Sequence, residues 1–324
     1  MYRIFSRATN VPKQKSLAQI NRAYHNSFFL GNSLNKFYDI KMTPNLSRSL
    51  KTADELKEEI YTKQSKTNGN LKKAIYDKLR YLWTFNSNAI EGSQLSLGDT
   101  IFFLQEGLTV SGKPLKDFLD AQNHSEAIDY LNEVIQGDVQ IDTHLLCSIN
   151  QILLHNIDFI FGKDALGKPI QKKIHAGEYK KEPNYVIQID GSIHHYVEPF
   201  DVPAQMGDLC QWIDTNLNKQ HPIITASIAH YNKVRIHPFQ DGNGRGARIL
   251  MNLILMSHQF TPAIIEVSKR KEYLLCLKAA DKGNLLPFTE FVADSINQTQ
   301  RVILDEINEY LAKNEGSGIK PKLP

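Results

Sequence analysis

The chain has 324 residues, a formal net charge of +3 and 41% hydrophobic residues. This length supports one sizeable core, or a core with an appendage. The near-balanced charge gives no reason to expect binding to nucleic acid or to a membrane surface, and no apolar run approaches the ~20 residues of a membrane span. Cys147, Cys210 and Cys276 lie scattered in apolar stretches, which favours reduced thiols and a cytoplasmic location.

The first 41 residues are basic and polar, with no acidic residue before Asp39. A mitochondrial transit peptide has this composition. The competing interpretation is a disordered extension, or a reading frame that begins too early, because Met42 followed by Thr43 and Pro44 is a plausible start. The second interpretation is favoured. No apolar core and cleavage site of a signal peptide are present, so secretion is not expected.

Helical periodicity dominates the rest of the chain and predicts an all-α fold. Apolar residues at spacings of three and four predict helices over Asp54–Gln64, Leu71–Asn88, Leu97–Glu106, Leu115–Ile135, Thr143–Ile157, Val202–Asn216, Ile223–Ile236, Asn243–Met256, Arg270–Ala280 and Pro287–Ala312. Gly107–Lys113 and Phe161–Pro183 have the composition of loops. The tail from Asn314 to Pro324 is rich in Gly, Pro and Lys, which is typical of a flexible end.

One segment predicts a β-hairpin, expected to be the only one in the chain. Val186–Ile189 and Ser192–Val197 flank Asp190-Gly191, a pair typical of two-residue hairpin turns. An isolated hairpin is marginal in water, so this one must lean on helices, and its edge could accept an extended peptide as an added strand. The adjacent His194 and His195 do not predict a zinc site, because neighbouring strand residues point to opposite faces.

The segment from His237 to Arg248 carries the most chemistry, and it predicts a polyphosphate site. Pro238 ends the helix before it, so the imidazole of His237 is free to face a ligand. Gly242 and Gly244 tolerate positive φ, which lets successive backbone N–H groups converge on an anion as a nest. The next helix starts there, and its N-terminal N–H groups and dipole add to the attraction.

Charged side chains complete this predicted site. Arg245 and Arg248 are three residues apart on one helical face, and each guanidinium suits phosphate oxygens. Asp241 is placed to hold Mg²⁺ against the same phosphates, and the imidazole of His237 could accept a proton near neutral pH. A lone histidine at a helix end is usually structural, and Gly-Asn-Gly is a common turn. Only the ordered combination indicates a nucleoside triphosphate.

The combination resembles the signature of the Fic domain family, His-x-Phe-x-Asp/Glu-Gly-Asn-Gly-Arg-x-x-Arg, at every defined position. Upstream, the stretch from Ser87 to Gly92 resembles the inhibitory motif Ser/Thr-x-x-x-Glu-Gly/Asn of one subgroup of that family. The resemblance implies a Fic-type helical bundle with one β-hairpin flap. It divides the chain into a basic extension (1–41), an N-terminal helical region with an inhibitory helix (42–140), a core domain (141–313) and a flexible tail (314–324).

The resemblance also implies an activity, transfer of AMP from ATP to a Ser, Thr or Tyr hydroxyl of a target protein with release of pyrophosphate. His237 would then be the general base and Asp241 the Mg²⁺ ligand. The remaining implied roles are phosphate binding by Gly242, Asn243 and Gly244, a clamp on the outer phosphates by Arg245 and Arg248, a nucleotide contact by Tyr273, and target positioning by Ile187, Ile189 and Ile193. Self-modification is expected, and a homodimer is left open.

Glu91 and Ser87 are four residues apart and share a helical face. If their helix docks against the clamp, the carboxylate of Glu91 would pair with Arg248 and occupy the volume of a γ-phosphate. The alternative without a function is that Glu91 is a solvent-exposed residue at a helix end. Two other functions also stay open. Glu91 could orient water to remove AMP from a modified target, or the protein could be a non-catalytic module that senses nucleotide, although an intact His237 argues against the latter.

Overall fold

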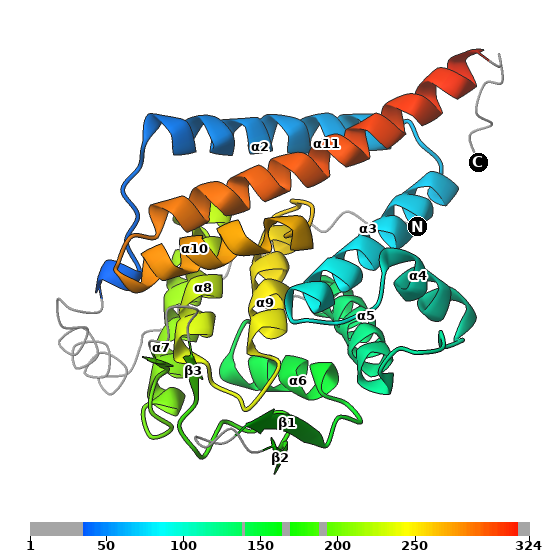
Figure 1. Ribbon diagram of the computed structural model, residues 1–324. Helices are drawn as coiled ribbons and strands as arrows, with labels where there is room; N and C mark the ends of the chain where they lie inside the picture. The colour runs from blue at the N-terminus through cyan, green and yellow to red at the C-terminus, as the bar shows by residue number, and fades with distance from the viewer. Residues whose placement is uncertain (1–34, 138–139, 164–168, 188–192, 317–324) are drawn as a thin grey trace.

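The computed structural model describes residues 35–137, 140–163, 169–187 and 193–316, and its architecture is mostly helical (Figure 1). All ten predicted helices are present. The helices are α2 (Pro44–Gln64), α3 (Gly69–Ile90), α4 (Leu97–Glu106), α5 (Leu115–Gln136), α6 (Thr143–Leu153), α7 (Val202–Asn216), α8 (Pro222–Ile236), α9 (Asn243–Ser257), α10 (Arg270–Asp281) and α11 (Leu286–Gly316), with short 3₁₀ turns η1 (Asn35–Phe37) and η2 (Val267–Lys269).

The start of α2 differs from the prediction, because the helix begins at Pro44 and not at Asp54. The side-chain oxygen of Thr43 accepts a hydrogen bond from the backbone N–H of Leu46 at 3.1 Å, so Thr43 is the N-cap. Proline is well suited to the first turn that follows, where its missing N–H costs nothing. Leu46 and Leu50 are buried and extend the apolar face of the helix.

Most of the helices contribute to one large hydrophobic core, and smaller apolar clusters lie beside it. Helices α2 and α11 lie together across one end of the molecule, and α8 and α9 run through its interior (Figure 1). A single cluster of buried side chains joins Leu46 of α2, Leu131 of α5, Leu250 of α9 and Val292 of α11. This cluster includes residues on both sides of residue 140, where the resemblance divides the chain into an N-terminal region and a core domain.

Residues 35–41 do not form the disordered extension that the sequence predicted for them. The ring of Phe37 packs 6.0 Å from that of Tyr231, and the ring of Tyr38 lies 5.3 Å from that of Trp212. The amide of Asn232 donates to the carbonyl of Phe37 at 2.8 Å. These aromatic contacts anchor the segment on the core, while residues 1–34 lie outside the described residues.

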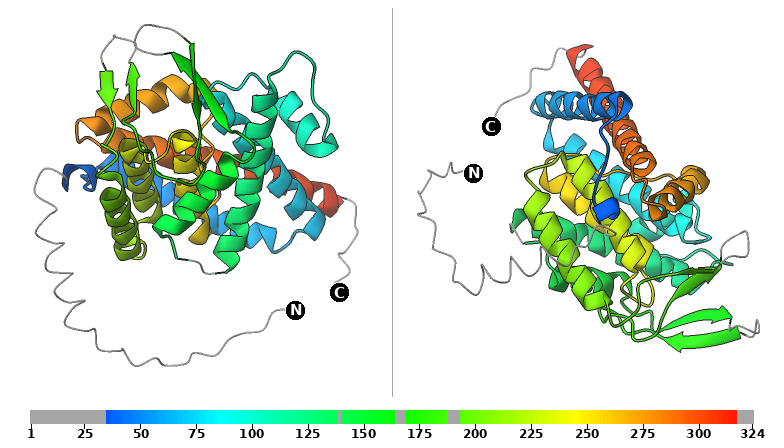
Figure 2. Two further views of the ribbon diagram at one scale, coloured as in Figure 1. Left: turned by 90° about the horizontal axis from the view of Figure 1, so that it is seen from below. Right: turned by 90° about the vertical axis from the view of Figure 1, so that its left-hand side faces the viewer.

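Two antiparallel hairpins are present in the described parts of the chain, so the prediction of a single hairpin is wrong. Strand β3 (Tyr185–Ile187) pairs with β4 (Ile193–His195), as predicted. Strand β1 (Phe159–Lys163) pairs with β2 (Pro169–Lys173), and this second hairpin falls largely in the stretch Phe161–Pro183 that was predicted to be a loop. Both hairpins project from the same side of the helical body (Figure 2). Ile189 and the Asp190-Gly191 turn lie outside the described residues.

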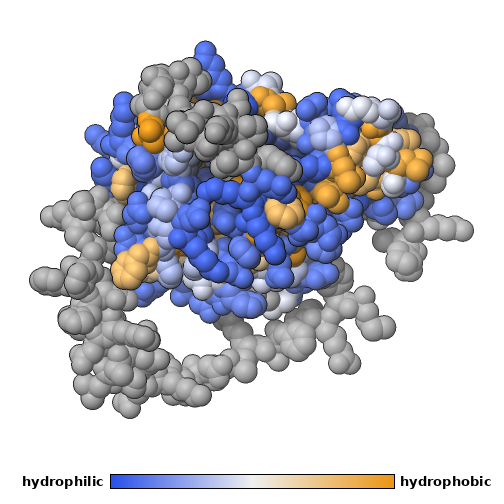
Figure 3. Space-filling model, turned by 60° about the horizontal axis from the view of Figure 1, so that its bottom comes forward, coloured by the Kyte–Doolittle hydropathy of each residue, from blue (hydrophilic) through white to orange (hydrophobic). Residues whose placement is uncertain are grey.

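The surface is largely hydrophilic on the face shown in Figure 3, and apolar side chains gather toward one side of it. Exposed large apolar residues in the described part of the chain include Phe102 of α4, Leu108 of the segment that follows and Leu115 at the start of α5. Phe200, between β4 and α7, is 93% exposed. None of the helices described is both long and apolar enough to cross a membrane. Helix α11 reaches Gly316, and the rest of the predicted tail is outside the described residues.

Candidate active site

His237 ends α8 in a left-handed backbone conformation, with φ of +52°. Its backbone N–H still donates to the carbonyl of Lys233 at 3.0 Å, which completes the last helical turn. The chain leaves the helix here as Pro238 predicted. However, it turns through the left-handed region, which a non-glycine residue rarely adopts, and not into extended backbone. This turn carries the imidazole to the start of the signature loop.

The loop then delivers the N-terminus of α9. Gly242 precedes the helix with φ of +75° and provides no side-chain cap, so the first N–H groups of α9 have no side-chain acceptor from this position. The side chain of Asn243 turns back, accepting from the N–H of Phe239 at 3.0 Å and donating to its carbonyl at 2.8 Å. Asn243 therefore braces the loop with its side chain, and only its backbone is left to face a ligand.

Glu91 lies directly over this helix N-terminus. It follows the last residue of α3, and its Oε1 atom accepts a hydrogen bond from Nη2 of Arg248 at 2.7 Å. A Cβ atom added to Gly244 would collide with the same Oε1 atom. The nest predicted for phosphate thus has a carboxylate against it, and the N-terminus of a helix favours a negative charge in this place.

Ser87 holds the same guanidinium from the other side. Nε of Arg248 donates to the Ser87 hydroxyl at 2.9 Å, and Nη2 donates to the Ser87 carbonyl at 2.8 Å. The side chain of Arg248 is 2% exposed, whereas that of Glu91 is 44% exposed. Partial burial acts to raise the pKa of Glu91, but the charges of Arg248 and Arg245 hold it below its usual value. Glu91 is therefore ionised at neutral pH.

The second signature arginine has a partner that the sequence did not reveal. Nη1 of Arg245 donates to Oδ1 of Asp120 on α5, and both side chains are buried. Lys116 contacts the other oxygen of Asp120 at 2.6 Å. Asp120 occupies an ordinary helical position with no local motif, so only the packing of α5 against α9 could reveal this pair.

Asp241 fits the role of a cation ligand. Its carboxylate is 32% exposed and lies 3.7 Å from Nη2 of Arg245, while Oδ1 accepts from the N–H of Gly242 at 2.7 Å. The buried amide of Asn150 holds the backbone here, donating to the Asp241 carbonyl at 3.0 Å and accepting from the N–H of Gly177 at 2.9 Å. Within the described ranges no group of three His, Cys, Asp or Glu could hold a metal alone. Mg²⁺ commonly relies on one or two carboxylates and substrate oxygens, and Asp241 offers such a carboxylate.

The imidazole of His237 is enclosed by cations and one aromatic ring. Burial, together with the charges of Lys180 and Lys233, lowers its pKa to about 3, so the ring is neutral near pH 7. Lys233 is itself buried, which lowers its pKa to about 7, and among the residues that the structure describes its Nζ atom has no hydrogen-bond partner. The ring of Tyr196 stacks on the imidazole with centroids 3.7 Å apart and planes 16° apart.

Tyr273 is a core residue beneath the site, so the predicted nucleotide contact is not supported. Its side chain is 2% exposed, and its hydroxyl lies 3.0 Å from Nε2 of His230. Its ring packs against Phe288 and Phe291.

Of the predicted flap residues, Ile187 pairs with Ile193 across β3 and β4, and Ile193 is exposed.

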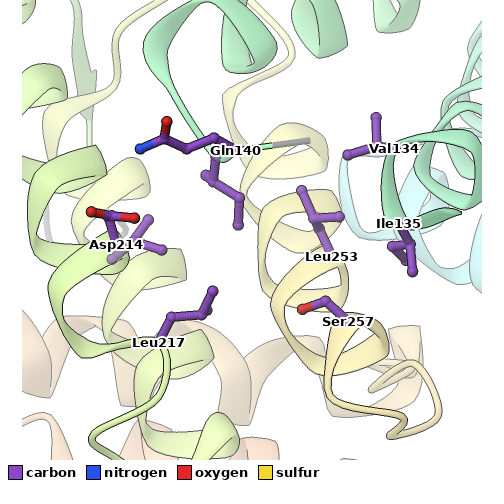
Figure 4. A pocket seen from close by; sticks show the side chains of 9 residues that line it. Val134, Ile135, Gln140, Asp214, Leu217, Leu253 and Ser257 are labelled. Atoms are coloured by element: carbon purple, nitrogen blue, oxygen red, sulfur yellow. The ribbon is translucent and has the colours of Figure 1, made fainter. Parts of the chain in front are cut away.

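A pocket of about 390 Å³ lies elsewhere, between the ends of α5, α7 and α9 (Figure 4). Its lining is mostly apolar, with Asp214, Ser257 and Gln140 as the polar exceptions. No predicted site residue lines it.

Comparison with known proteins agrees with this geometry. Residues 140–255 match the Fic/DOC family, and this segment holds the loop, the nest and both arginines. The chain contains a Fic domain. It is homologous to Fic protein adenylyltransferases, with 31% identity over 252 residues to protein adenylyltransferase fic-1 of Caenorhabditis briggsae and 34% over 218 residues to that of Caenorhabditis elegans. The matches cover 76% and 66% of this chain, but only 45% and 39% of those relatives, so the Fic chain spans less than half of their length.

Solved structures confirm the Fic fold. A Fic domain containing signaling protein from Bacteroides thetaiotaomicron superposes with a TM-score of 0.68 at 25% identity, covering 78% of this chain and 97% of that protein. A structure of Fic-1 from C. elegans, residues 134–508, gives 0.67 at 26% identity and covers 91% and 78% of the two chains. Both similarities cover far more of the chain than the segment matched by the family.

Proposed function

We propose that this protein is an adenylyltransferase that transfers AMP from ATP to a Ser, Thr or Tyr hydroxyl of a target protein. Homologues are named for this activity. The observation that carries the proposal is the neutral imidazole of His237, held at the start of a loop that ends in a helix N-terminus flanked by two buried arginines. A general base beside an anion nest suits attack of a hydroxyl on the α-phosphorus of ATP with cleavage of the anhydride bond to pyrophosphate.

The reaction follows from this arrangement. His237 takes the proton of the target hydroxyl as its oxygen bonds to the α-phosphorus, and the bond to pyrophosphate breaks. The N–H groups of Asn243 and Gly244 hold phosphate oxygens, Gly242 provides the turn before them and donates to Asp241, and Arg245 and Arg248 hold the outer phosphates. Asp241 would hold Mg²⁺, which neutralises charge on the phosphates when bound. An extended target segment lies along the β3–β4 hairpin near Ile187, Ile189 and Ile193.

Glu91 keeps the enzyme inactive in this proposal. Its carboxylate lies against Gly244 and engages the guanidinium that the γ-phosphate needs, with Ser87 holding the far side of Arg248. ATP could then bind only in a displaced pose with its α-phosphate poorly aligned. Release of Glu91 would permit both target modification and self-modification.

The three cysteines are free, which agrees with the cytoplasmic location that the sequence favours. A homodimer is compatible with this proposal.

Removal of AMP is the second candidate, and it depends on the same residue. Glu91 is ionised and partly exposed beside the nest, where it could orient water toward a modified hydroxyl. Incubation of a modified target without ATP separates the two directions, because only the hydrolase releases free AMP.

The deciding experiment is incubation with α-labelled ATP and Mg²⁺, followed by mass spectrometry of the protein and of lysate proteins. We expect an added AMP on the Glu91→Gly protein. Adding His237→Ala should reduce transfer by ~10²–10⁴-fold while ATP still binds, because binding depends on the nest and the arginines. Transfer that survives loss of the imidazole would refute the assignment of the base.

A further inference from the structure

The contact between Tyr196 and His237 joins the hairpin to the imidazole. Tyr196 directly follows β4, and its ring lies parallel to the imidazole at 3.7 Å. The ring of His194 meets Tyr196 edge-on at 5.0 Å, and Nζ of Lys180 lies 5.9 Å from the centre of the Tyr196 ring. No element of the signature explains this stack, because Tyr196 lies outside it.

The backbone ties the same hairpin to the signature loop. The N–H of Tyr196 donates to the carbonyl of Asn184 at 3.2 Å, and the side-chain amide of Asn184 donates to the carbonyl of Phe239 at 3.1 Å. The N–H of Lys180 also donates to the carbonyl of Pro238 at 2.8 Å. The base of the hairpin and the loop after His237 are therefore one hydrogen-bonded unit.

A stacked aromatic ring restrains rotation of an imidazole about χ2, and this rotation sets the direction in which a histidine accepts a proton. Rotation of a histidine about χ2 is broad and weakly restrained by its own bonds. Proton transfer requires a heavy-atom distance of ~2.6–3.2 Å, and a misplacement of ~1 Å can cost ~10²-fold in rate. Offset or parallel contact between aromatic rings is worth ~0.5–1.5 kcal/mol, enough to bias the ring plane.

We propose that Tyr196 is a positioning residue that fixes the plane of the His237 imidazole, so that a target strand docked on the β3–β4 hairpin orients the general base through this ring. The inference depends on the proposed transferase function. It adds that the β3–β4 hairpin, which receives the target, also fixes the orientation of His237 through Tyr196. Tyr196 is not a second base, because burial and the charges of Asp281 and Glu91 raise its pKa to about 12 and keep its hydroxyl protonated.

The kinetic test uses Glu91→Gly as the parent, with Tyr196→Phe, Tyr196→Leu and Tyr196→Ala added. The Phe ring keeps the stack, so kcat should stay within ~2-fold of the parent. The Leu and Ala variants lose the flat ring, so kcat should fall ~10–100-fold while KM for ATP changes little. Tyr61→Ala is the control, because it removes an exposed tyrosine ring from α2, which belongs neither to the hairpin nor to the site. Its kcat should equal that of the parent.

A spectroscopic test does not need activity. With ¹³C-labelled histidine, the Hε1 signal of His237, assigned with His237→Ala, should show a ring-current shift in the parent and in Tyr196→Phe, and lose it in Tyr196→Leu. The pKa of His237 should rise in the Leu and Ala variants as water reaches the ring, although Lys180, Lys233 and His194 still face it.

The outcomes separate the two proposals. If the parent transfers no AMP to any protein, the proposed function fails, while the NMR shift still tests the stack. If the parent is active and Tyr196→Leu retains its kcat and its His237 signal, the positioning role is wrong. An equal loss in Tyr196→Phe and Tyr196→Leu would also overturn it, because the hydroxyl would then matter and not the ring.

Discussion

Two arginines one helical turn apart on α9 meet very different carboxylates. Arg245 pairs with Asp120, whose side chain is 9% exposed, and Arg248 pairs with Glu91, whose side chain is 44% exposed. Removing one partner of a buried pair leaves an uncompensated charge. Both members of the first pair are buried, so it is a fixed part of the fold. In the second pair only Arg248 is buried, and it keeps its two hydrogen bonds to Ser87 when the half-exposed carboxylate of Glu91 leaves, so this pair opens more readily than the first.

The location of each carboxylate supports this distinction. Asp120 lies within α5, which packs along α9, and a change in its position would have to move a whole helix. Glu91 lies at the C-terminal end of α3, next to Gly92 with φ of +103°. A helix end beside such a glycine can fray without disturbing the core. In the proposed function, α9 therefore presents one arginine with a structural role and one arginine that Glu91 regulates.

Breaking the buried pair should have the largest effect on stability. Asp120→Ala leaves the guanidinium of Arg245 buried without its carboxylate, and we expect the free energy of unfolding to fall by ~3–5 kcal/mol. Urea denaturation followed by circular dichroism measures this loss. Asp129→Ala is the matched control on α5, because Asp129 pairs with Arg80 at the surface and its removal should cost ~1 kcal/mol or less. Equal losses in both variants would contradict a structural role specific to Asp120.

Breaking the half-exposed pair should instead change activity. If Glu91 holds ~99% of molecules inactive, Glu91→Gly should raise AMP transfer by up to ~100-fold. Arg248 keeps its two hydrogen bonds to Ser87 in this variant, so the free energy of unfolding should fall by less than in Asp120→Ala. Glu91→Gln keeps the shape without the charge and should give a smaller gain. Arg248→Ala should not mimic it, because the arginine is also needed for the outer phosphate. No gain in self-modification or target modification with Glu91→Gly would mean that the contact is not inhibitory.

The cation site is expected to give a moderate effect. Asp241→Asn removes the carboxylate charge beside Arg245, so the Mg²⁺ concentration for half-maximal transfer should rise by ~10-fold or more in the Glu91→Gly background. A Mg²⁺ titration of transfer at saturating ATP measures it. An unchanged midpoint would show that the cation is held without Asp241.

The contrast between the two pairs also marks what the sequence could predict. The Glu91–Arg248 pair was expected because both residues belong to motifs that resemble family signatures. Asp120 gave no local signal, since only the contact between α5 and α9 makes it a partner of Arg245. Tyr196 was equally hidden, because its stack on His237 depends on how the hairpin folds back.

The fold shows the same division. Long helices were predictable because their apolar residues repeat at helical spacing. The β1–β2 hairpin was missed, since Gly162 and Pro169 interrupt any alternation in its short strands. The start of α2 at Pro44 could have been predicted from the sequence, because Thr43 followed by Pro44 is a regular helix beginning.

The smallest expected effect is a pH profile that does not change. The base acts in its unprotonated form, and the lowered pKa of His237, about 3, means that activity is lost only as the pH falls toward that value. A histidine with an ordinary pKa of ~6.5 would instead lose ~30-fold in rate between pH 8 and pH 5. In the Glu91→Gly protein, kcat should therefore vary by ~2-fold or less across this range, measured by intact-protein mass spectrometry at saturating ATP and Mg²⁺.

Comparing the pH dependence of the wild-type protein with that of the Glu91→Gly protein tests the ionisation of Glu91. The pKa of Glu91 is held below its usual value of 4.5, so its carboxylate stays ionised and paired with Arg248 until the pH falls through that lowered pKa. Acid should therefore not relieve inhibition between pH 8 and pH 5, and the ratio of Glu91→Gly to wild-type activity should stay constant. A ratio that falls steadily toward pH 5 would show that Glu91 titrates in this range. A steep loss of kcat in the Glu91→Gly protein between pH 8 and pH 5 would show that the pKa of His237 is not lowered. The packing of Tyr196, Lys180 and Lys233 around the imidazole would then not shield it from water.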